Sequence, residues 1–191
     1  MPVAMRASDF DILIVPRRGG GHEGDWPNRW RAKLSTARFV HPPDAHDGRA
    51  QAWAEAIVAA ARDAARPILF VGHGTGAAAI AHAAPSLHGA DVRGAFLVAP
   101  PDLAALERFG RGWPLPLHRL PWRSLVIASR NDPDGGFDAV SSLAGQWGSE
   151  LIDAGAAGQI DAASGHGPWP EGLMRLAGFI KAISERPLRP H

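Results

Sequence analysis

Short runs of apolar, β-branched residues alternate along this chain with longer segments in which apolar residues recur every three or four positions. The short runs predict strands and the longer segments predict helices. The predicted strands are Asp11 to Val15, Ala37 to His41, Pro67 to Gly72, Val92 to Ala99, Arg123 to Ser129 and Glu150 to Ala154. The predicted helices are Trp26 to Leu34, Arg49 to Ala64, Thr75 to Ala84, Phe137 to Trp147 and Glu171 to Ile183. This alternation is typical of a parallel sheet with helices on both faces, so we expect an α/β fold.

The length and the proline distribution set the expected organisation. A chain of 191 residues is long enough to bury one sizeable core and short for two, so we expect a single domain over 1–191 with its core at about 10–183. The segment 100–121 has no period and is rich in proline, which predicts a long excursion over the strand ends. We expect the tail, 184–191, to fray.

Charge and composition exclude several classes of function. With 20 basic and 19 acidic side chains the net charge is +1, so no long-range field favours nucleic acid or an anionic membrane as a partner. The chain has no cysteine, which excludes disulfides, thiolate metal sites and a cysteine nucleophile. No apolar stretch approaches the length of a membrane span or of a signal segment, and we expect a cytoplasmic protein.

The most informative strand exit follows the third predicted strand. There the apolar run meets Gly72-His73-Gly74-Thr75-Gly76, and a helix of small residues begins. This is the framework of a G-x-S-x-G nucleophile elbow in which Gly74 replaces the central serine. A plain glycine turn before a helix would give the same string, so the later strand exits have to decide between the two interpretations.

The later exits favour the elbow. Asp132 follows the fifth predicted strand directly, at the usual position of the acid in a Ser, Asp, His chain order. After the sixth strand, the position where a base is expected holds Gln159. The acid is therefore present, whereas the nucleophile and the base are absent.

At this point the chain resembles a known family. The residues that carry the resemblance are Leu13-Ile14-Val15-Pro16, Trp26 with Arg29-Trp30, the elbow, Val98-Ala99-Pro100-Pro101-Asp102, Ala128-Ser129-Arg130-Asn131-Asp132-Pro133, and Ser164-Gly165 with Gly167-Pro168-Trp169-Pro170-Glu171-Gly172. Over about residues 10–181 these motifs are similar to the compact serine hydrolases of the α/β-hydrolase superfamily, which include the human retinoblastoma-binding serine hydrolase and many bacterial relatives. The resemblance implies a three-layer α/β-hydrolase-like sandwich of about six parallel strands in the order 2-1-3-4-5-6.

Transferred to this sequence, the family's triad falls on Gly74, Asp132 and Gln159. Glycine offers no atom to acylate, and a glutamine amide cannot accept and return a proton near neutral pH. We therefore expect a catalytically inactive member of the family, retained as a small-ligand-binding or protein-interaction module. The alternative is a weak or non-standard serine hydrolase or esterase acting on small esters or amides, with His166 and a nearby serine or a water molecule replacing the lost groups.

Two further hypotheses concern the residues around the elbow. An unpaired Asp132 leads us to expect a hydrogen bond from the Gln159 amide. The first loop has Arg17-Arg18 where relatives have a small glycine-rich opening, which puts the oxyanion region in doubt. With the Thr75 N–H at a helix N-terminus, these arginines are candidates for binding a small carboxylate, ester or phosphate, the alternative being two solvated surface side chains.

Other constellations give weaker signals. His41, Asp44, His46 and Asp47 share one loop, but their spacing fits no recognised metal site, and we expect neither a metal nor a cofactor. The glycine-rich run after Pro16 lacks the lysine and hydroxyl of a phosphate loop. His166 is a substitute base or a solvent-facing histidine. Trp113 and Trp122 either pack in the core or line a pocket or protein-partner surface, and the sequence carries no signal for an oligomeric state.

Overall fold

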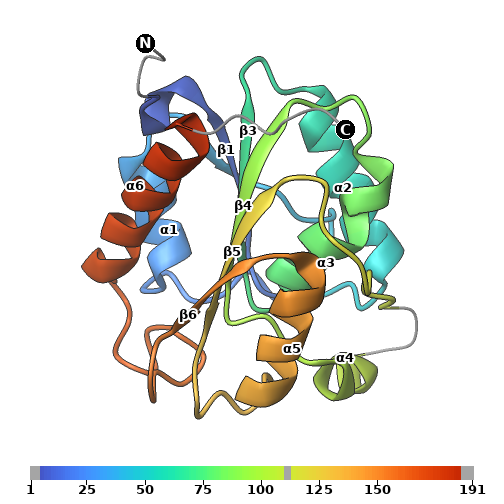
Figure 1. Cartoon of the computed structure of the whole chain (residues 1–191), viewed down its shortest axis with the longest axis vertical. Helices are drawn as coiled ribbons and strands as arrows, with labels where there is room; N and C mark the ends of the chain where they lie inside the picture. Colours follow the sequence, from blue (N-terminus) through green and yellow to red (C-terminus); the bar gives the residue numbers. More distant parts are fainter. Residues whose placement is uncertain (1–4, 110–112, 186–191) are drawn as a thin grey trace.

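A single parallel sheet forms the centre of the structure, a computed structural model that describes residues 5–109 and 113–185 (Figure 1). The strands are β1 (Asp11–Val15), β2 (Ala37–Phe39), β3 (Ile68–His73), β4 (Val92–Val98), β5 (Arg123–Ala128) and β6 (Glu150–Asp153). Their order is β2-β1-β3-β4-β5-β6, and every neighbouring pair is parallel. The six predicted strands and their order are therefore confirmed.

Helices cover both faces of this sheet, as predicted. The helices are α1 (Trp26–Lys33), α2 (Ala50–Arg62), α3 (Thr75–Ala83), α4 (Leu103–Phe109), α5 (Phe137–Trp147) and α6 (Pro170–Glu185). One core cluster packs α2, α3 and α5 against one face, and a second packs α1 and α6 against the other. Strands β1, β3 and β5 are almost completely buried, which explains their continuous apolar runs, whereas the edge strands β2 and β6 are half-buried or exposed.

Helix α4 corrects the prediction for 100–121, which had no detectable period. Only two of its seven residues, Ala105 and Leu106, are buried, so the apolar stripe is too short to recognise. Asp102 supports the start of α4 because its side chain accepts a hydrogen bond from the Ala105 N–H at 2.8 Å. Trp113 and Trp122, in the remainder of the excursion, are buried in the core.

The C-terminal prediction is tested only in part. Helix α6 extends to Glu185, two residues beyond its predicted end, so the first residues of the tail are helical. The rest of the tail, 186–191, lies outside the described residues, as do 1–4 and 110–112.

The start of α3 lies unusually close to the end of β1. A Cβ atom placed on Gly76 would overlap the carbonyl oxygen of Val15, and one on Gly72 would lie 2.6 Å from the Ala77 Cα. Glycine is therefore required at both positions because the helix packs directly against strand backbone. This close approach brings the loop after β1 over the first turn of α3.

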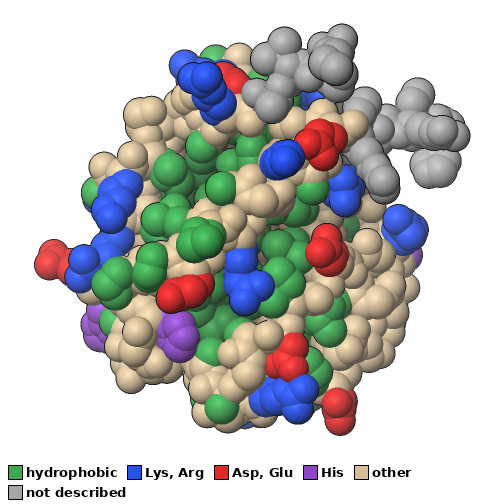
Figure 2. All heavy atoms as spheres, turned by 60° about the vertical axis from the view of Figure 1, so that its left-hand side comes forward, with side chains coloured by type: hydrophobic (Ala, Val, Ile, Leu, Met, Phe, Trp, Pro, Cys, Tyr) green, Lys and Arg blue, Asp and Glu red, His purple; other side chains and the backbone are tan. Residues whose placement is uncertain are grey.

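The surface is of mixed character. On the face over α1 and α6, basic and acidic side chains are intermixed with small groups of hydrophobic side chains (Figure 2). This distribution agrees with a net charge of +1. Of the helices in the described part of the chain, none is long and apolar enough to cross a membrane.

We predict that Gly76→Ala destabilises the protein by about 3 kcal/mol or more, because the added methyl group forces α3 away from β1. Gly178→Ala is the matched control. Gly178 lies inside α6 with open space where a Cβ would lie, so this change stabilises by about 0.5–1 kcal/mol. Urea unfolding followed by far-UV circular dichroism measures both. Equal stability of Gly76→Ala and the parent would contradict this close packing of α3 against β1.

Candidate functional site

The turn from β3 into α3 has the backbone of a nucleophile elbow. Gly74, between the strand and the helix, has φ 56° and ψ −125°, a backbone conformation that residues other than glycine adopt only under strain. Its N–H donates to the Val98 carbonyl oxygen at 2.9 Å, which fixes the turn to the neighbouring strand. Gly74 thus has the backbone conformation of an elbow nucleophile but no side chain.

A cavity of about 340 Å³ opens at this elbow. Its residues come from the loop after β1, the elbow, the loop after β4, the end of α4, and the loops after β5 and β6. The apolar wall consists of Ala99, Pro101 and Phe109. The polar and glycine lining consists of Arg17, Arg18, Gly19, Gly21, His22, His73, Gly74, Thr75, Asp134 and Gln159.

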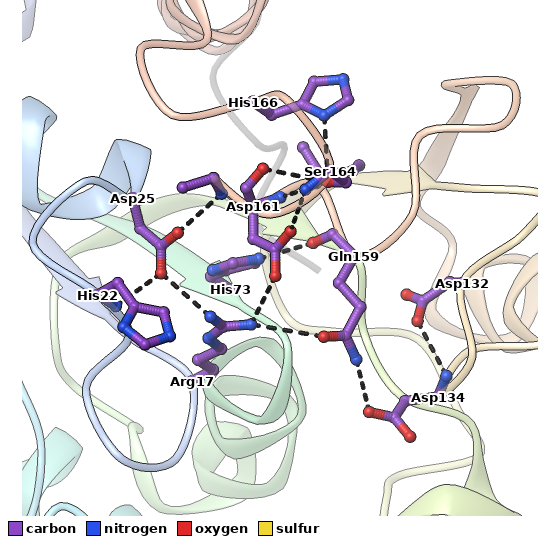
Figure 3. Close-up of polar contacts among 12 residues, drawn as sticks. Arg17, His22, Asp25, His73, Asp132, Asp134, Gln159, Asp161, Ser164 and His166 are labelled. Carbon is purple, nitrogen blue, oxygen red and sulfur yellow. Dashed lines mark hydrogen bonds and ion pairs between the residues drawn. The ribbon is translucent and has the colours of Figure 1, made fainter.

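Arg17 is held by two carboxylates next to the cavity (Figure 3). Its guanidinium donates to Asp161 at 2.8 Å and to Asp25 at 3.2 Å, and Asp25 is only 1% exposed. Burial raises the pKa of Asp161, but hydrogen bonds from Ser164 and Arg17 outweigh it and hold that pKa below its ordinary value. Arg17 is therefore neither a solvated surface side chain nor an unpaired anion receptor.

The Gln159 side chain lies between Arg17 and Asp134 (Figure 3). Its Nε2 donates to Asp134 Oδ2 at 2.6 Å, and its Oε1 accepts a longer hydrogen bond, 3.4 Å, from Arg17. The predicted hydrogen bond from Gln159 to Asp132 is wrong. Asp134 lies two residues further along the same loop and accepts the hydrogen bond from the amide instead.

Asp132 is left without a cationic or amide side-chain partner among the described residues. Its Oδ1 accepts the Asp134 N–H at 2.9 Å, which closes a tight turn. Burial, together with the charges of Asp134 and Asp102, raises the pKa of Asp132 to about 6, although backbone hydrogen bonds oppose this. The acid position is therefore occupied but orients no other side chain.

The oxyanion region keeps one of its two usual donors. The Thr75 N–H begins α3 and has no acceptor among the described residues, so it can face a bound oxygen atom. The Arg18 N–H, in the loop beside it, donates to Thr75 Oγ1 at 2.6 Å and is not free. The exposed Arg18 side chain donates from Nε to the His46 carbonyl oxygen at 2.7 Å.

Two buried aromatic side chains hold the backbone of the loop after β6 by hydrogen bonds. The buried His73 ring donates from Nε2 to the Gln159 carbonyl oxygen at 2.9 Å and lies 5.2 Å from the Trp26 ring. Trp26 in turn donates to the Ile160 carbonyl oxygen at 2.9 Å. Burial lowers the pKa of His73 to about 4, so the ring is neutral at physiological pH and acts as a fixed support.

His166 belongs to the segment between β6 and α6. It is absent from the cavity lining, and its Nδ1 lies 3.3 Å from the hydroxyl of Ser164. That hydroxyl also bonds to the backbone of Asp161, with its oxygen accepting the Asp161 N–H at 3.0 Å. Ser129, the other serine considered, bonds to Asn131 and to the loop after β6. Both hydroxyls serve local structure.

The loop with His41, Asp44, His46 and Asp47 has ordinary surface contacts. Asp47 forms an ion pair with Arg49, and Asp44 accepts the His46 N–H. Across residues 5–109 and 113–185, no group of three or more His, Asp or Glu side chains is placed to hold a metal ion.

Sequence reasoning missed three carboxylates of this site: Asp25, Asp134 and Asp161. Each lies in an irregular segment with no motif of its own, and only the three-dimensional structure brings Asp25 and Asp161 to the same arginine. One signal was available, because an arginine in a glycine-rich loop at a strand exit requires an acidic partner when it is buried. Nothing in the sequence pattern selects that partner among the acidic residues of the chain.

Comparisons with known proteins agree with this geometry. A family model described as "Serine hydrolase" matches residues 12–178. A protein described as a YdeN-like hydrolase from Pectobacterium atrosepticum is 28% identical, with a TM-score of 0.85 over 93% of this chain and 94% of that one. The ydeN gene product of B. subtilis is 17% identical, with a TM-score of 0.71 over 93% of this chain and all of that one.

A more distant structure has the same fold. The esterase domain of a Rhodothermus marinus protein is 14% identical, with a TM-score of 0.64 over 95% of this chain and 90% of that one. No curated protein is significantly similar to this chain. The predicted six-stranded α/β-hydrolase architecture is thus confirmed.

We predict that Asp132→Asn stabilises the protein at pH 8 by about 1 kcal/mol, a figure that allows for partial exposure of the carboxyl. The folded pKa of about 6 exceeds the unfolded value, so Asp132 contributes stability below about pH 4 that is lost as the pH rises through 6. Asparagine can keep the turn hydrogen bond without the charge. Urea unfolding at pH 8 and pH 4 measures the difference in unfolding free energy between the variant and the parent. This difference is expected to disappear at pH 4. The exposed Asp63→Asn is the control, and a difference of equal size at both pH values would contradict the prediction.

Proposed function

This chain belongs to the serine hydrolase family, and we propose that it is a member without hydrolase activity that uses the elbow cavity to bind a small ligand. The observation that carries this proposal is Gly74, which has the backbone conformation of the nucleophile and no side chain. A glycine removes the atom that an acyl group would be transferred to, while the shape of the turn is kept.

The remaining lining of the cavity supports the absence of covalent catalysis. Thr75 is the one hydroxyl among the described lining residues, and its oxygen already accepts the Arg18 N–H. The His73 ring donates to a carbonyl oxygen and has a pKa of about 4, so it is a poor base near neutral pH. Among the described residues, the Thr75 hydroxyl therefore forms no hydrogen bond with a histidine or carboxylate that could activate it.

The available groups favour a ligand with one carbonyl or carboxylate oxygen and a small apolar group. The Thr75 N–H can donate to that oxygen, and Ala99, Pro101 and Phe109 form an apolar wall beside it. Phosphate is supported less well, because it requires several donors and the Arg17 donors are committed to Asp25, Asp161 and Gln159. A volume of about 340 Å³ suits a small molecule.

A weak hydrolase is the alternative, and one contact favours it. Ser164 and His166 are 3.3 Å apart, close to the distance of a nucleophile and its base. The pair lies outside the cavity lining, however, and the Ser164 oxygen accepts a backbone N–H.

We predict that the purified parent protein shows no labelling by a fluorophosphonate probe and no turnover of a chromogenic short-chain ester above the solvent rate. Gly74→Ser with Gln159→His restores the hydroxyl and the imidazole of the triad. Adding Arg17→Gly gives the hydroxyl room, because a Cβ on residue 74 lies only 3.2 Å from the Arg17 Cβ. Labelling is expected in the triple variant, with less in the double variant. Mass spectrometry identifies the labelled residue.

One outcome of this experiment is decisive. Labelling of a single serine in the parent protein would contradict the proposal, and Ser164→Ala would then show whether Ser164 is the nucleophile. Circular dichroism and urea unfolding establish that each variant is folded, since Arg17→Gly leaves the buried Asp25 without its ion pair. Arg17→Gly with Asp25→Asn restores the charge balance if the triple variant is unstable.

We predict that butyrate and butyramide, tested separately with the isotope-labelled protein, shift the backbone N–H resonances of Thr75 and Ala99. The physical reason is that an oxygen on the free Thr75 N–H places an alkyl group against the apolar wall. Inorganic phosphate is the comparison ligand. Arg18→Ala, on the cavity rim, weakens butyrate more than butyramide if charge contributes. Unchanged Thr75 and Ala99 resonances with all three compounds would contradict ligand binding at the elbow.

A further inference from the structure

A second hollow lies between α2 and the segment 114–118, beside the end of α3, and it shares no lining residue with the elbow cavity. Its volume is about 630 Å³, and its surface is mostly apolar. Helix α2 forms one wall, and the end of α3 with the segment 114–118 forms the other. We call this hollow the α2 groove.

The α2 wall presents an ordered pair of charges. Glu55 and Arg62 are exposed, line the groove, and are separated by seven residues, or two turns and about 10 Å of helix. Between them lie Val58, which is half-buried, and Ala59, which is exposed. Within the described residues, neither charged side chain forms an ion pair. The wall therefore carries a negative end, a small apolar centre and a positive end.

The opposite wall is rigid although it belongs to an irregular segment. His82 Nδ1 donates to the Pro114 carbonyl oxygen at 2.8 Å, and Trp147 Nε1 donates to the Pro116 carbonyl oxygen at 2.8 Å. Leu117, between two groove-lining residues, has 62% of its surface exposed. A fixed apolar wall with an exposed leucine at its rim is better suited to contact with a protein surface than to contact with water.

We propose that the α2 groove is the interface of a homodimer in which the α2 helices of two copies pair antiparallel about a two-fold axis at Val58 and Ala59. In an antiparallel pair centred there, residue 55 of one copy faces residue 62 of the other. Glu55 therefore meets the partner's Arg62, and by symmetry Arg62 meets the partner's Glu55. The small side chains at the centre allow the two helices to approach closely.

The two kinds of contact have different roles in this interface. Exposed ion pairs contribute little affinity, but they set orientation and disfavour the parallel arrangement, in which like charges would face each other. Affinity comes from covering Val58, Leu117 and the proline-containing wall. The charges favour a second copy as the occupant. When a second α2 lies antiparallel to the first, each acidic end faces a basic end.

Sedimentation velocity of the full chain, from about 1 µM to about 100 µM, tests the proposal over the range in which a micromolar dimer dissociates. The parent protein is expected to shift from monomer to dimer. Glu55→Arg and Arg62→Glu, each alone, are expected to weaken association by about tenfold or more, since like charges then face each other. The double variant Glu55→Arg with Arg62→Glu restores association. Arg175→Glu, an exposed change on α6, is the control.

Disulfide trapping locates the axis, because the chain has no cysteine of its own. Ala59→Cys is expected to form a covalent dimer under mild oxidation, since the two-fold axis brings the two thiols together. Ala177→Cys, at an exposed position on α6, is the matched control and is expected to form far less.

A parent protein that stays monomeric at the highest concentration would overturn the proposal. So would a charge-swapped variant that associates no better than the single variants, or equal trapping of the two cysteine variants. A dimer that is insensitive to Glu55 and Arg62 would also overturn it, because the interface would then lie on another face. None of these outcomes bears on ligand binding at the elbow, whose lining is separate.

Discussion

The ion pairs of Arg17 with Asp25 and Asp161 tie the two ends of the loop between β1 and α1 to the loop after β6, which is distant in sequence. Arg17 follows β1, Asp25 precedes α1, and Asp161 follows β6. Removing the arginine would leave two partly or fully buried carboxylates without a counter-charge, which is far more costly than losing an exposed pair. The loop after β6 is therefore fixed by charge from one side and by the aromatic support of His73 and Trp26 from below.

The residues at positions 17, 74 and 159 fit one another. Gln159 presents an acceptor toward Arg17 and a donor toward Asp134, and one side-chain amide satisfies both neighbours. A protonated histidine at position 159 would face the Arg17 guanidinium and be repelled by it. The Arg17 Cβ also leaves little space for a side chain at position 74, which suits glycine. Arg17, Gly74 and Gln159 are therefore mutually compatible in packing and hydrogen bonding.

The sequence predicted the architecture well because buried parallel strands are short, continuous, β-branched apolar runs, as in β3 and β5. Helix α4 was missed because seven residues with two buried positions carry no period. At the site, Gly74 lies at the turn between β3 and α3, where its local glycine motif predicts it. The partner of Gln159 was wrong because Asp132 and Asp134 are two residues apart, and only the backbone turn determines which carboxylate faces the amide.

Two residues in or next to the wall of the elbow cavity have a strained backbone. Gly74 relieves the strain of the elbow, but Ala99, in the cavity wall, and Ile160, next to the lining residue Gln159, keep positive φ angles of 47° and 51°. Such conformations cost about 1–3 kcal/mol each and persist only where the surroundings impose them. A branched residue such as Ile160 is especially unfavourable there. The backbone strain of this site therefore lies at residues that shape the cavity and not at Gly74, which agrees with the proposed use of the cavity for ligand binding.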